Sequence, residues 1–238
     1  MIPAIETETQ FPILIVDTAS PTTFAGLGVN GGGWSWEEEI RESGIALFTC
    51  VERLLRSRPV PIQSIRTVAF CEGPGSILGI RTVAMALRTW MASGFLPAAT
   101  LMTYSSLALA TAGLRRHCAD GPLTVAIDAR RQSWFCLTSP HPATPASEIR
   151  RIPQEQVGGI SPPVLLPEGF PIWNPRPESW TNCAYEPRLL ESTEVRRQIL
   201  RPVALPDAYQ PESPSYQKWT PPVNRELGPT PSPEHARR

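Results

Sequence analysis

The first half of the chain alternates short apolar runs with longer stretches in which apolar residues recur every three or four positions. The run PILIVDTAS predicts a buried strand that ends at Asp17, and TTFAGLGV and GWSWEEE predict two further strands. These two strands are joined through Asn30-Gly31-Gly32, where Asn-Gly supplies the positive φ angles of a tight hairpin turn. The chain therefore opens with a strand followed by a hairpin.

A helical period follows the hairpin. Between residues 38 and 57 the apolar side chains fall on one arc, which predicts an amphipathic helix. The arc consists of Leu47, Phe48, Val51, Leu54 and Leu55. Further elements are predicted as a strand over IRTVAFCEG, a helix from about Ser76 to Ala92, a strand at 99–102, a helix at 105–113, and strands over LTVAIDA and SWFCLTS. This alternation of strand and helix favours an α/β layer architecture.

Proline divides the chain into a regular half and an interrupted half. Eight of the 28 prolines lie in the first 139 residues and the other twenty in the last 99. Because proline fixes φ and removes a backbone donor, we expect only short strands, loops and one short helix near 191–200 beyond that point. The predicted domains are an N-terminal lobe over 1–119, a reduced lobe over 120–220 and a disordered tail over 221–238.

The charge balance and the apolar segments restrict the class of protein. Lys plus Arg and Asp plus Glu both total 22, so the overall field does not favour direct, dominant binding of tRNA or DNA. The acidic start MIPAIETETQFPILIV is unlike a secretory signal, which begins with basic residues. The apolar stretch 83–102 contains Arg88 and Pro97, which a bilayer core would penalise. We expect a cytoplasmic protein without a membrane span.

The cysteines and histidines predict neither a disulfide framework nor a metal site. The five cysteines include no Cys-x-x-Cys pair. His117, His141 and His235 lie far apart and lack the helical spacing that places two ligands on one face.

The stretch EGPGS before the helix at 76–92 admits two interpretations. Backbone N–H groups at a helix N-terminus can bind phosphate, and glycine lets the backbone approach closely. However, a P-loop requires Gly-x-x-x-x-Gly-Lys-Ser or Thr, whereas Gly79 is followed here by Ile80 and Arg81. We therefore prefer a structural interpretation, in which Pro74 fixes the turn and Ser76 caps the helix.

The helix at 76–92 has two apolar sides. One stripe predicts contact with a sheet and consists of Ile77, Ile80, Ala84, Leu87 and Met91, with Val83 at its edge. The opposite side carries small or adaptable groups where a solvent-facing helix would carry Lys and Glu, namely Leu78, Thr82, Met85, Ala86 and Thr89. Two explanations stay open, a helix central in one monomer and a surface for a partner protein, and the second is the sharper hypothesis.

The segment GPGSILGIRTV, residues 73–83, resembles the signature of the TsaB family, the YeaZ-like dimerisation subunit of the bacterial tRNA threonylcarbamoyladenosine machinery. Further similarity lies in ILIVDTAS, TYSSLALA, AIDARRQSWF and SPSYQKW, and it covers residues 13–136 best. The chain departs from the family pattern at Ile77-Leu78, at Val83 and at Glu42-Ser43, where relatives carry Phe-Thr, Gly and His-Ser. It is identified as a divergent member.

The resemblance implies the actin-like ATPase fold, also called ribonuclease H-like, with two lobes that each hold a mixed sheet and flanking helices. It implies a non-catalytic dimerisation subunit that supports a TsaD-like catalytic subunit in threonylcarbamoyl transfer to the adenosine beside the anticodon. A TsaE-like ATPase would join through the complex, tRNA would be contacted indirectly, and the chain alone would form a homodimer. No cofactor is expected. The implied interface residues are Ser76, Leu78, Gly79, Arg81, Thr82, Met85, Arg88 and Thr89.

Two other functions compete with this one. An autonomous actin-fold ATPase or kinase needs an Asp-x-Gly-Thr-like turn, and the turns after Asp17 and Asp128 lack the glycine. We interpret both aspartates as structural and keep them as weaker candidates for a degenerate nucleotide site. A glycoprotease-like peptidase would need zinc ligands or a nucleophile beside a base, which three scattered histidines do not favour. Arg130 and Arg131 could touch RNA phosphate, although an ordinary solvated turn is the preferred interpretation.

Overall fold

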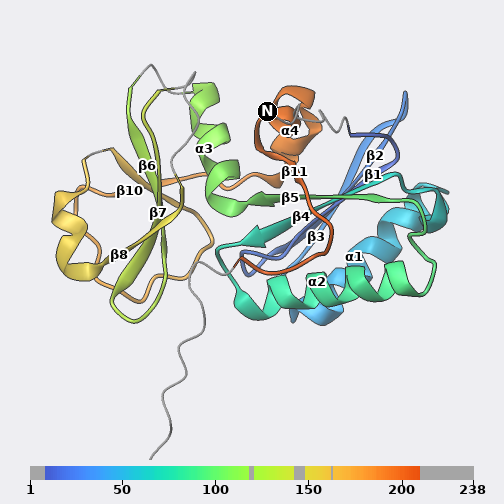
Figure 1. The fold of residues 1–238 in the computed structure, drawn as a ribbon, viewed down its shortest axis with the longest axis horizontal. Helices are drawn as coiled ribbons and strands as arrows, with labels where there is room; N and C mark the ends of the chain where they lie inside the picture. The colour runs from blue at the N-terminus through green and yellow to red at the C-terminus, as the bar shows by residue number, and fades with distance from the viewer. Residues whose placement is uncertain (1–8, 118–120, 142–147, 162, 210–238) are drawn as a thin grey trace, which may run out of the picture.

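A computed structural model describes residues 9–117, 121–141, 148–161 and 163–209, which form two β-sheets beside one another (Figure 1). The first sheet has the strand order β11-β5-β4-β1-β2-β3. Its strands are β1 (Ile13–Asp17), β2 (Thr23–Val29), β3 (Gly33–Glu39), β4 (Thr67–Gly73), β5 (Thr100–Ser105) and β11 (Arg201–Pro202). The second sheet has the order β10-β9-β6-β7-β8. Its strands are β6 (Leu123–Asp128), β7 (Ser133–Ser139), β8 (Arg150–Pro153), β9 (Val164–Pro167) and β10 (Thr181–Cys183).

The two sheets repeat one topology. In the first, β1, β2 and β3 form an antiparallel meander, and β4 and β5 continue in parallel on the other side of β1. In the second, β6, β7 and β8 form the meander, and β9 and β10 continue in parallel on the other side of β6. This repeated unit confirms the predicted α/β, actin-like fold with two lobes.

The lobes differ in what covers their sheets. In the first lobe, α1 (Ser43–Ser57) and α2 (Ile77–Ala92) connect β3 to β5 and pack on one face, while α3 (Ser106–His117) packs on the other face, toward the second lobe. In the second lobe the described residues of the equivalent connections hold only the 3-10 helix η2 (Gln154–Gly159) and an irregular segment. The rings of Trp134 and Trp180, which meet edge to face with centroids 4.9 Å apart, fill part of the space there. The second lobe is therefore reduced, as its prolines predicted.

The C-terminal segment returns to the first lobe. The 3-10 helix η3 (Pro187–Glu191) and α4 (Thr193–Ile199) precede β11, which pairs with β5. A third short 3-10 helix, η1 (Ile62–Ser64), precedes β4. The predicted boundaries near 119 and 221, and the predicted tail, lie outside the described residues and stay predictions. Within those residues, no helix combines the length and apolar character that a membrane span requires.

Most predicted elements of the first lobe are present with small shifts. The helix expected from residue 38 begins only at Ser43, because residues 37–39 pair with β2 and extend β3 to Glu39. The next helix begins at Ile77, one residue after its predicted cap, and the Ser76 hydroxyl accepts a hydrogen bond from the Gly79 N–H. The short helix expected near 191–200 is α4.

The glycine turn before α2 lies against backbone carbonyl groups of the β1–β2 loop. A Cβ atom on Gly75 would lie 2.2 Å from the Ala19 oxygen, and one on Gly79 would lie 2.6 Å from the Thr18 oxygen. The Ser76 N–H donates to the same Ala19 oxygen at 2.7 Å. Gly75 and Gly79 therefore pack against carbonyl oxygens, and the Ser76 N–H, which could otherwise bind a phosphate, is already hydrogen-bonded. This geometry supports a packing role for the turn.

Asp17, at the end of β1, lies in a buried polar cluster that joins distant parts of the chain. Its Oδ2 accepts hydrogen bonds from the hydroxyls of Tyr104 at 2.7 Å and Tyr185 at 2.6 Å, and its Oδ1 accepts from the Ala19 N–H at 2.9 Å. Burial raises the pKa of Asp17, and the hydrogen bonds from Tyr185, Ala19 and Tyr104 offset only part of that rise. The carboxyl group thus serves internal packing at this position.

The raised pKa of Asp17 predicts a pH dependence of stability. Because the folded pKa exceeds the unfolded one, the contribution is fully present below the unfolded value, about 4, and is lost as pH rises through the folded pKa. Replacement Asp17→Asn removes this dependence. We expect the free energy of unfolding of the wild type, measured with denaturant, to fall relative to that of Asp17→Asn as pH rises from 4 toward 8. A constant difference between the two proteins would contradict the assignment.

The close approach of Gly75 to the β1–β2 loop predicts that an added methyl group lowers the stability of the fold at this position but not at an open one. Gly75→Ala drives a Cβ into the Ala19 carbonyl and is expected to destabilise the fold by about 2–3 kcal/mol. Gly158→Ala is the matched control, since no atom lies within 4 Å of its added Cβ, and it should be neutral or stabilising by up to about 1 kcal/mol. Denaturant unfolding of both variants measures the difference. Equal stabilities would contradict the packing role.

Candidate protein-interaction face

Helix α2 buries one side on the sheet and exposes apolar residues on the other. Its sheet side is formed by Ile80, Val83, Ala84, Ala86 and Leu87. On the outer side, the side chain of Leu78 is 72% exposed and that of Met85 58%. Large apolar groups exposed together on one helix are typical of a surface that another protein covers.

The structure divides the eight predicted interface residues into two groups. Leu78, Arg81, Met85 and Thr89 are exposed and share one face of α2, as their spacing of three and four residues requires. The others serve the chain itself: Ser76 caps the helix, Gly79 is packed, the half-buried Thr82 bonds back to a helix carbonyl, and Arg88 binds the C-terminal segment.

Arg88 illustrates this second group. Its Nε donates to the Pro206 oxygen at 2.8 Å, and its Nη2 lies 3.6 Å from the Asp207 carboxylate. The segment after β11 therefore runs beside α2 and limits the width of the exposed face on that flank.

Three side chains lie on the side opposite to that predicted. Ile77, expected on the sheet, is 66% exposed because it is the first residue of α2, and Ile80 one turn later is the first to reach the core. Ala86, expected outside, is buried. Phe48, expected on the buried arc of α1, is half exposed and turns its ring toward Trp90, edge to face, with centroids 5.8 Å apart.

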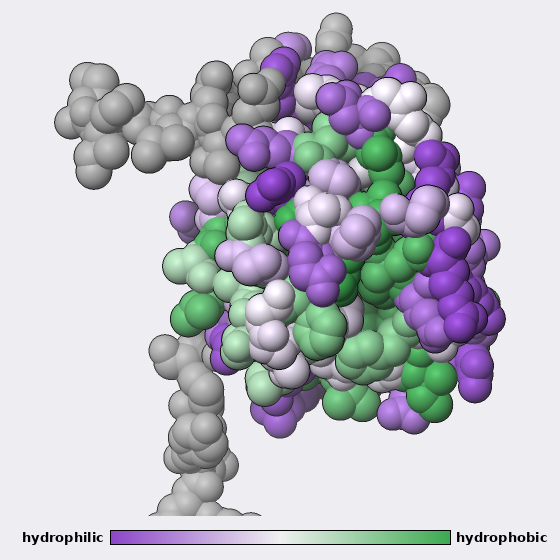
Figure 2. Space-filling model, turned by 90° about the vertical axis from the view of Figure 1, so that its right-hand side faces the viewer, coloured by the Kyte–Doolittle hydropathy of each residue, from purple (hydrophilic) through white to green (hydrophobic). Residues whose placement is uncertain are grey.

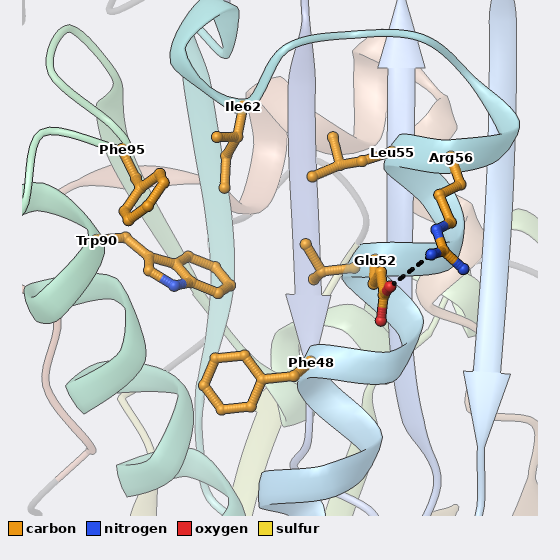
Figure 3. Close-up of a pocket in the computed structure, with 8 residues that line it drawn as sticks. Phe48, Glu52, Leu55, Arg56, Ile62, Trp90 and Phe95 are labelled. Carbon is orange, nitrogen blue, oxygen red and sulfur yellow. Dashed lines mark ion pairs between the residues drawn. The ribbon is translucent and has the colours of Figure 1, made fainter.

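A groove between α1 and α2 extends the exposed apolar surface. Its volume is about 420 Å³, and Figure 3 shows Phe48, Trp90 and Phe95 converging on it, with the ion pair between Glu52 and Arg56 at its rim. The remaining lining residues are Val51, Leu55 and Ile62. The end of the first lobe that carries this groove shows apolar groups exposed between charged ones (Figure 2).

We define the α1–α2 face as the exposed apolar residues of these helices and the turn after them: Ile45, Phe48, Ile77, Leu78, Met85 and Phe95. The sequence pattern identified Leu78 and Met85, but it assigned Ile77 to the sheet side and missed the contribution of α1 and of Phe95. Phe95 could have been found in the apolar stretch GFLP, which follows the helix after the capping residue Ser93. In the part of the chain that the structure describes, no group of three His, Cys, Asp or Glu side chains could hold a metal ion.

The second weaker candidate, Asp128, occupies in the second sheet the position that Asp17 occupies in the first. Both aspartates end the first strand of their meander, and both accept a hydrogen bond from the N–H two residues ahead. Asp128 also accepts from the N–H groups of Trp173 and Asn174 and from the Asn174 side chain. Both carboxylates therefore close turns with donors of the chain itself.

Two solved structures from Pseudomonas aeruginosa share this fold. One, described as an uncharacterized protein with similarity to peptidase YEAZ, is 17% identical over 72% of this chain and 83% of its own, with a TM-score of 0.55. The other, described as YeaZ, is 18% identical over 73% of this chain and 84% of its own, also with a TM-score of 0.55. A search of curated proteins found no significant match.

A family model matches the sequence over residues 30–161, more than half of the chain. Its description is TsaD, tRNA N6-adenosine threonylcarbamoyltransferase. The matched region begins at the β2–β3 hairpin and includes α1, α2 and the first strands of the second lobe. The chain therefore belongs to the TsaD family, as a divergent TsaB-like member.

Proposed function

We propose that the chain is a non-catalytic subunit that supports a TsaD-like catalytic subunit in threonylcarbamoyl transfer to the tRNA adenosine beside the anticodon. Membership of the TsaD family supports a role in this transfer system. The exposed α1–α2 face is the observation that carries the scaffold role.

The α1–α2 face has the chemistry of a protein contact. Burying a large aliphatic or aromatic side chain contributes about 1.5–3 kcal/mol, so a few of its six residues suffice to stabilise an association. The threonine hydroxyls on α2 already donate to helix carbonyls, at 2.9 Å from Thr82 to Leu78 and 2.9 Å from Thr89 to Met85. A partner can therefore cover them without leaving a buried donor unpaired.

The alternatives of an autonomous ATPase or kinase and of a peptidase find less support. A phosphate site at the first turn would need the Asp17 carboxylate and the glycine backbone, and both are engaged by the chain itself. The residues that line the groove beside the α1–α2 face include no histidine or cysteine, and their one carboxylate, that of Glu52, is paired with Arg56.

The same face would serve two complexes. Alone, the chain would pair with a second copy through α1 and α2, and the catalytic subunit would displace that copy. A TsaE-like ATPase would join through the complex, and the catalytic subunit would provide the main contact with tRNA. The proposed location is the cytoplasm.

Met85→Glu tests the scaffold role. Because Met85 is largely exposed, the variant should remain folded, as circular dichroism would verify, while a buried carboxylate should weaken self-association and capture of the TsaD-like subunit by at least about tenfold. Sedimentation and calorimetric titration measure the two equilibria. Ile172→Glu, which places the same charge on an exposed apolar residue of the second lobe, is the control and should change neither. Full partner affinity in Met85→Glu would refute the assignment.

A further inference from the structure

The β6–β7 turn holds three consecutive residues in the left-handed region, with φ angles of 58° at Arg130, 47° at Arg131 and 53° at Gln132. This region is unfavourable for a residue with a Cβ atom, and hairpin turns that require it normally use Asn or Gly. The β2–β3 hairpin of the first lobe does so, with Gly31 at a φ of 68°. The second-lobe turn instead carries two arginines and a glutamine, although Asn or Gly would adopt these φ angles with less strain.

Hydrogen bonds with the buried Asp128 and Ser133 and the half-buried Gln154 hold this turn in place. Asp128 accepts from the Arg130 N–H at 2.7 Å, and the Ser133 hydroxyl donates to the Arg130 carbonyl at 2.7 Å. The Gln154 N–H donates to the Gln132 carbonyl at 2.8 Å. Strain that the surroundings maintain in this way is a feature of functional sites more often than of ordinary loops.

The same aspartate fixes a tryptophan beside the turn. The N–H groups of Trp173 and Asn174 both donate to Asp128 Oδ2 at 2.7 Å, so two segments 45 residues apart form one unit. The guanidinium carbon of Arg130 lies 4.1 Å from the centre of the Trp173 ring, yet the tryptophan stays 55% exposed. Arg131 is exposed next to this pair.

We propose that this unit, residues 130–132 with Trp173, binds single-stranded RNA. Guanidinium groups recognise phosphate, and an exposed aromatic ring stacks on unpaired bases, which is the combination that single-stranded nucleic acid sites use. An acidic peptide would pair with the arginines but would make no use of the tryptophan. The exposed charges of the two segments favour an anion, since Arg130, Arg131 and Arg176 outnumber Glu178.

This inference goes beyond the proposed function, in which tRNA is contacted through the catalytic subunit, and it does not require the α1–α2 face. It also differs from the interpretation preferred from the sequence, in which Arg130 and Arg131 belong to an ordinary solvated turn. The chain has no net charge, so the site would neutralise only a few phosphates.

Fluorescence anisotropy with a labelled RNA stem-loop that carries a seven-nucleotide loop tests the proposal on the full chain. Arg131→Gly should weaken binding about fivefold. It should also reduce the slope of log Kd against log salt concentration by about one, as expected when one phosphate contact is lost. It should also raise the midpoint of thermal unfolding, because glycine accepts the left-handed conformation. Loss of affinity together with a gain in stability cannot result from unfolding.

Two further variants complete the test. Trp173→Ala should weaken binding at least about fivefold through lost stacking. Arg41→Ala removes an exposed arginine of the first lobe and should change the affinity less than about twofold. Wild-type affinity in Arg131→Gly and Trp173→Ala would overturn the proposal.

A competition experiment distinguishes RNA from an acidic protein. If a poly-glutamate peptide displaces the labelled RNA as well as unlabelled RNA does, and Trp173→Ala has no effect, the turn would be assigned to an acidic protein instead.

The outcome is independent of the scaffold role. Met85→Glu should bind the stem-loop as the wild type does, and Arg131→Gly should still capture the TsaD-like subunit. If one proposal fails, only its own measurement is affected, so the two failures can be told apart.

Discussion

The backbone contact between the glycine turn and the β1–β2 loop determines where α2 lies. With no side chain on Gly75 or Gly79, the turn approaches the carbonyl oxygens of Ala19 and Thr18 closely enough for α2 to begin directly against the sheet. Ile80 and Leu87 then reach the core, and the opposite side of the helix is left without cover. The exposed α1–α2 face is thus a consequence of the same packing that gives the turn its glycines, and no bound anion is needed to explain them.

The two lobes use one topological position in different ways. Each meander begins with a strand that ends in an aspartate, and each aspartate closes a turn onto the N–H two residues ahead. In the first lobe the second carboxylate oxygen is buried under the hydroxyls of Tyr104 and Tyr185, which ties the C-terminal segment to the sheet. In the second lobe it binds two backbone N–H groups and leaves the turn at the surface. Equivalent positions in the two sheets therefore give a buried contact in the first lobe and a hydrogen-bonded turn at the surface in the second.

The sequence predicted those parts that depend on local pattern. The strand β1 is apolar up to Asp17 because it is buried on both faces, with Ile13 and Ile15 toward α3 and Leu14 and Val16 toward α1 and α2. The start of α2 follows from its serine cap. Contacts over long separations could not be predicted: the hydrogen bond from Tyr185 to Asp17 spans 168 residues, and no periodicity encodes it. The short strands β9 and β10 are too brief for a period of two to emerge among prolines.

Composition also concealed a local feature, because a chain with equal numbers of acidic and basic residues gives no sign of an anion site. The residue letters Arg130-Arg131 show charge but not conformation, and a solvated turn was the simpler interpretation. The φ angles change that interpretation, since an ordinary turn has no reason to hold arginines where asparagine or glycine fits with less strain. Nor does the sequence reveal that the ring of Trp173 lies beneath Arg130, since this depends on the hydrogen bond from the Trp173 N–H to Asp128, which spans 45 residues. Strain and convergence are properties of the fold, and they turn two surface charges into a site with a defined geometry.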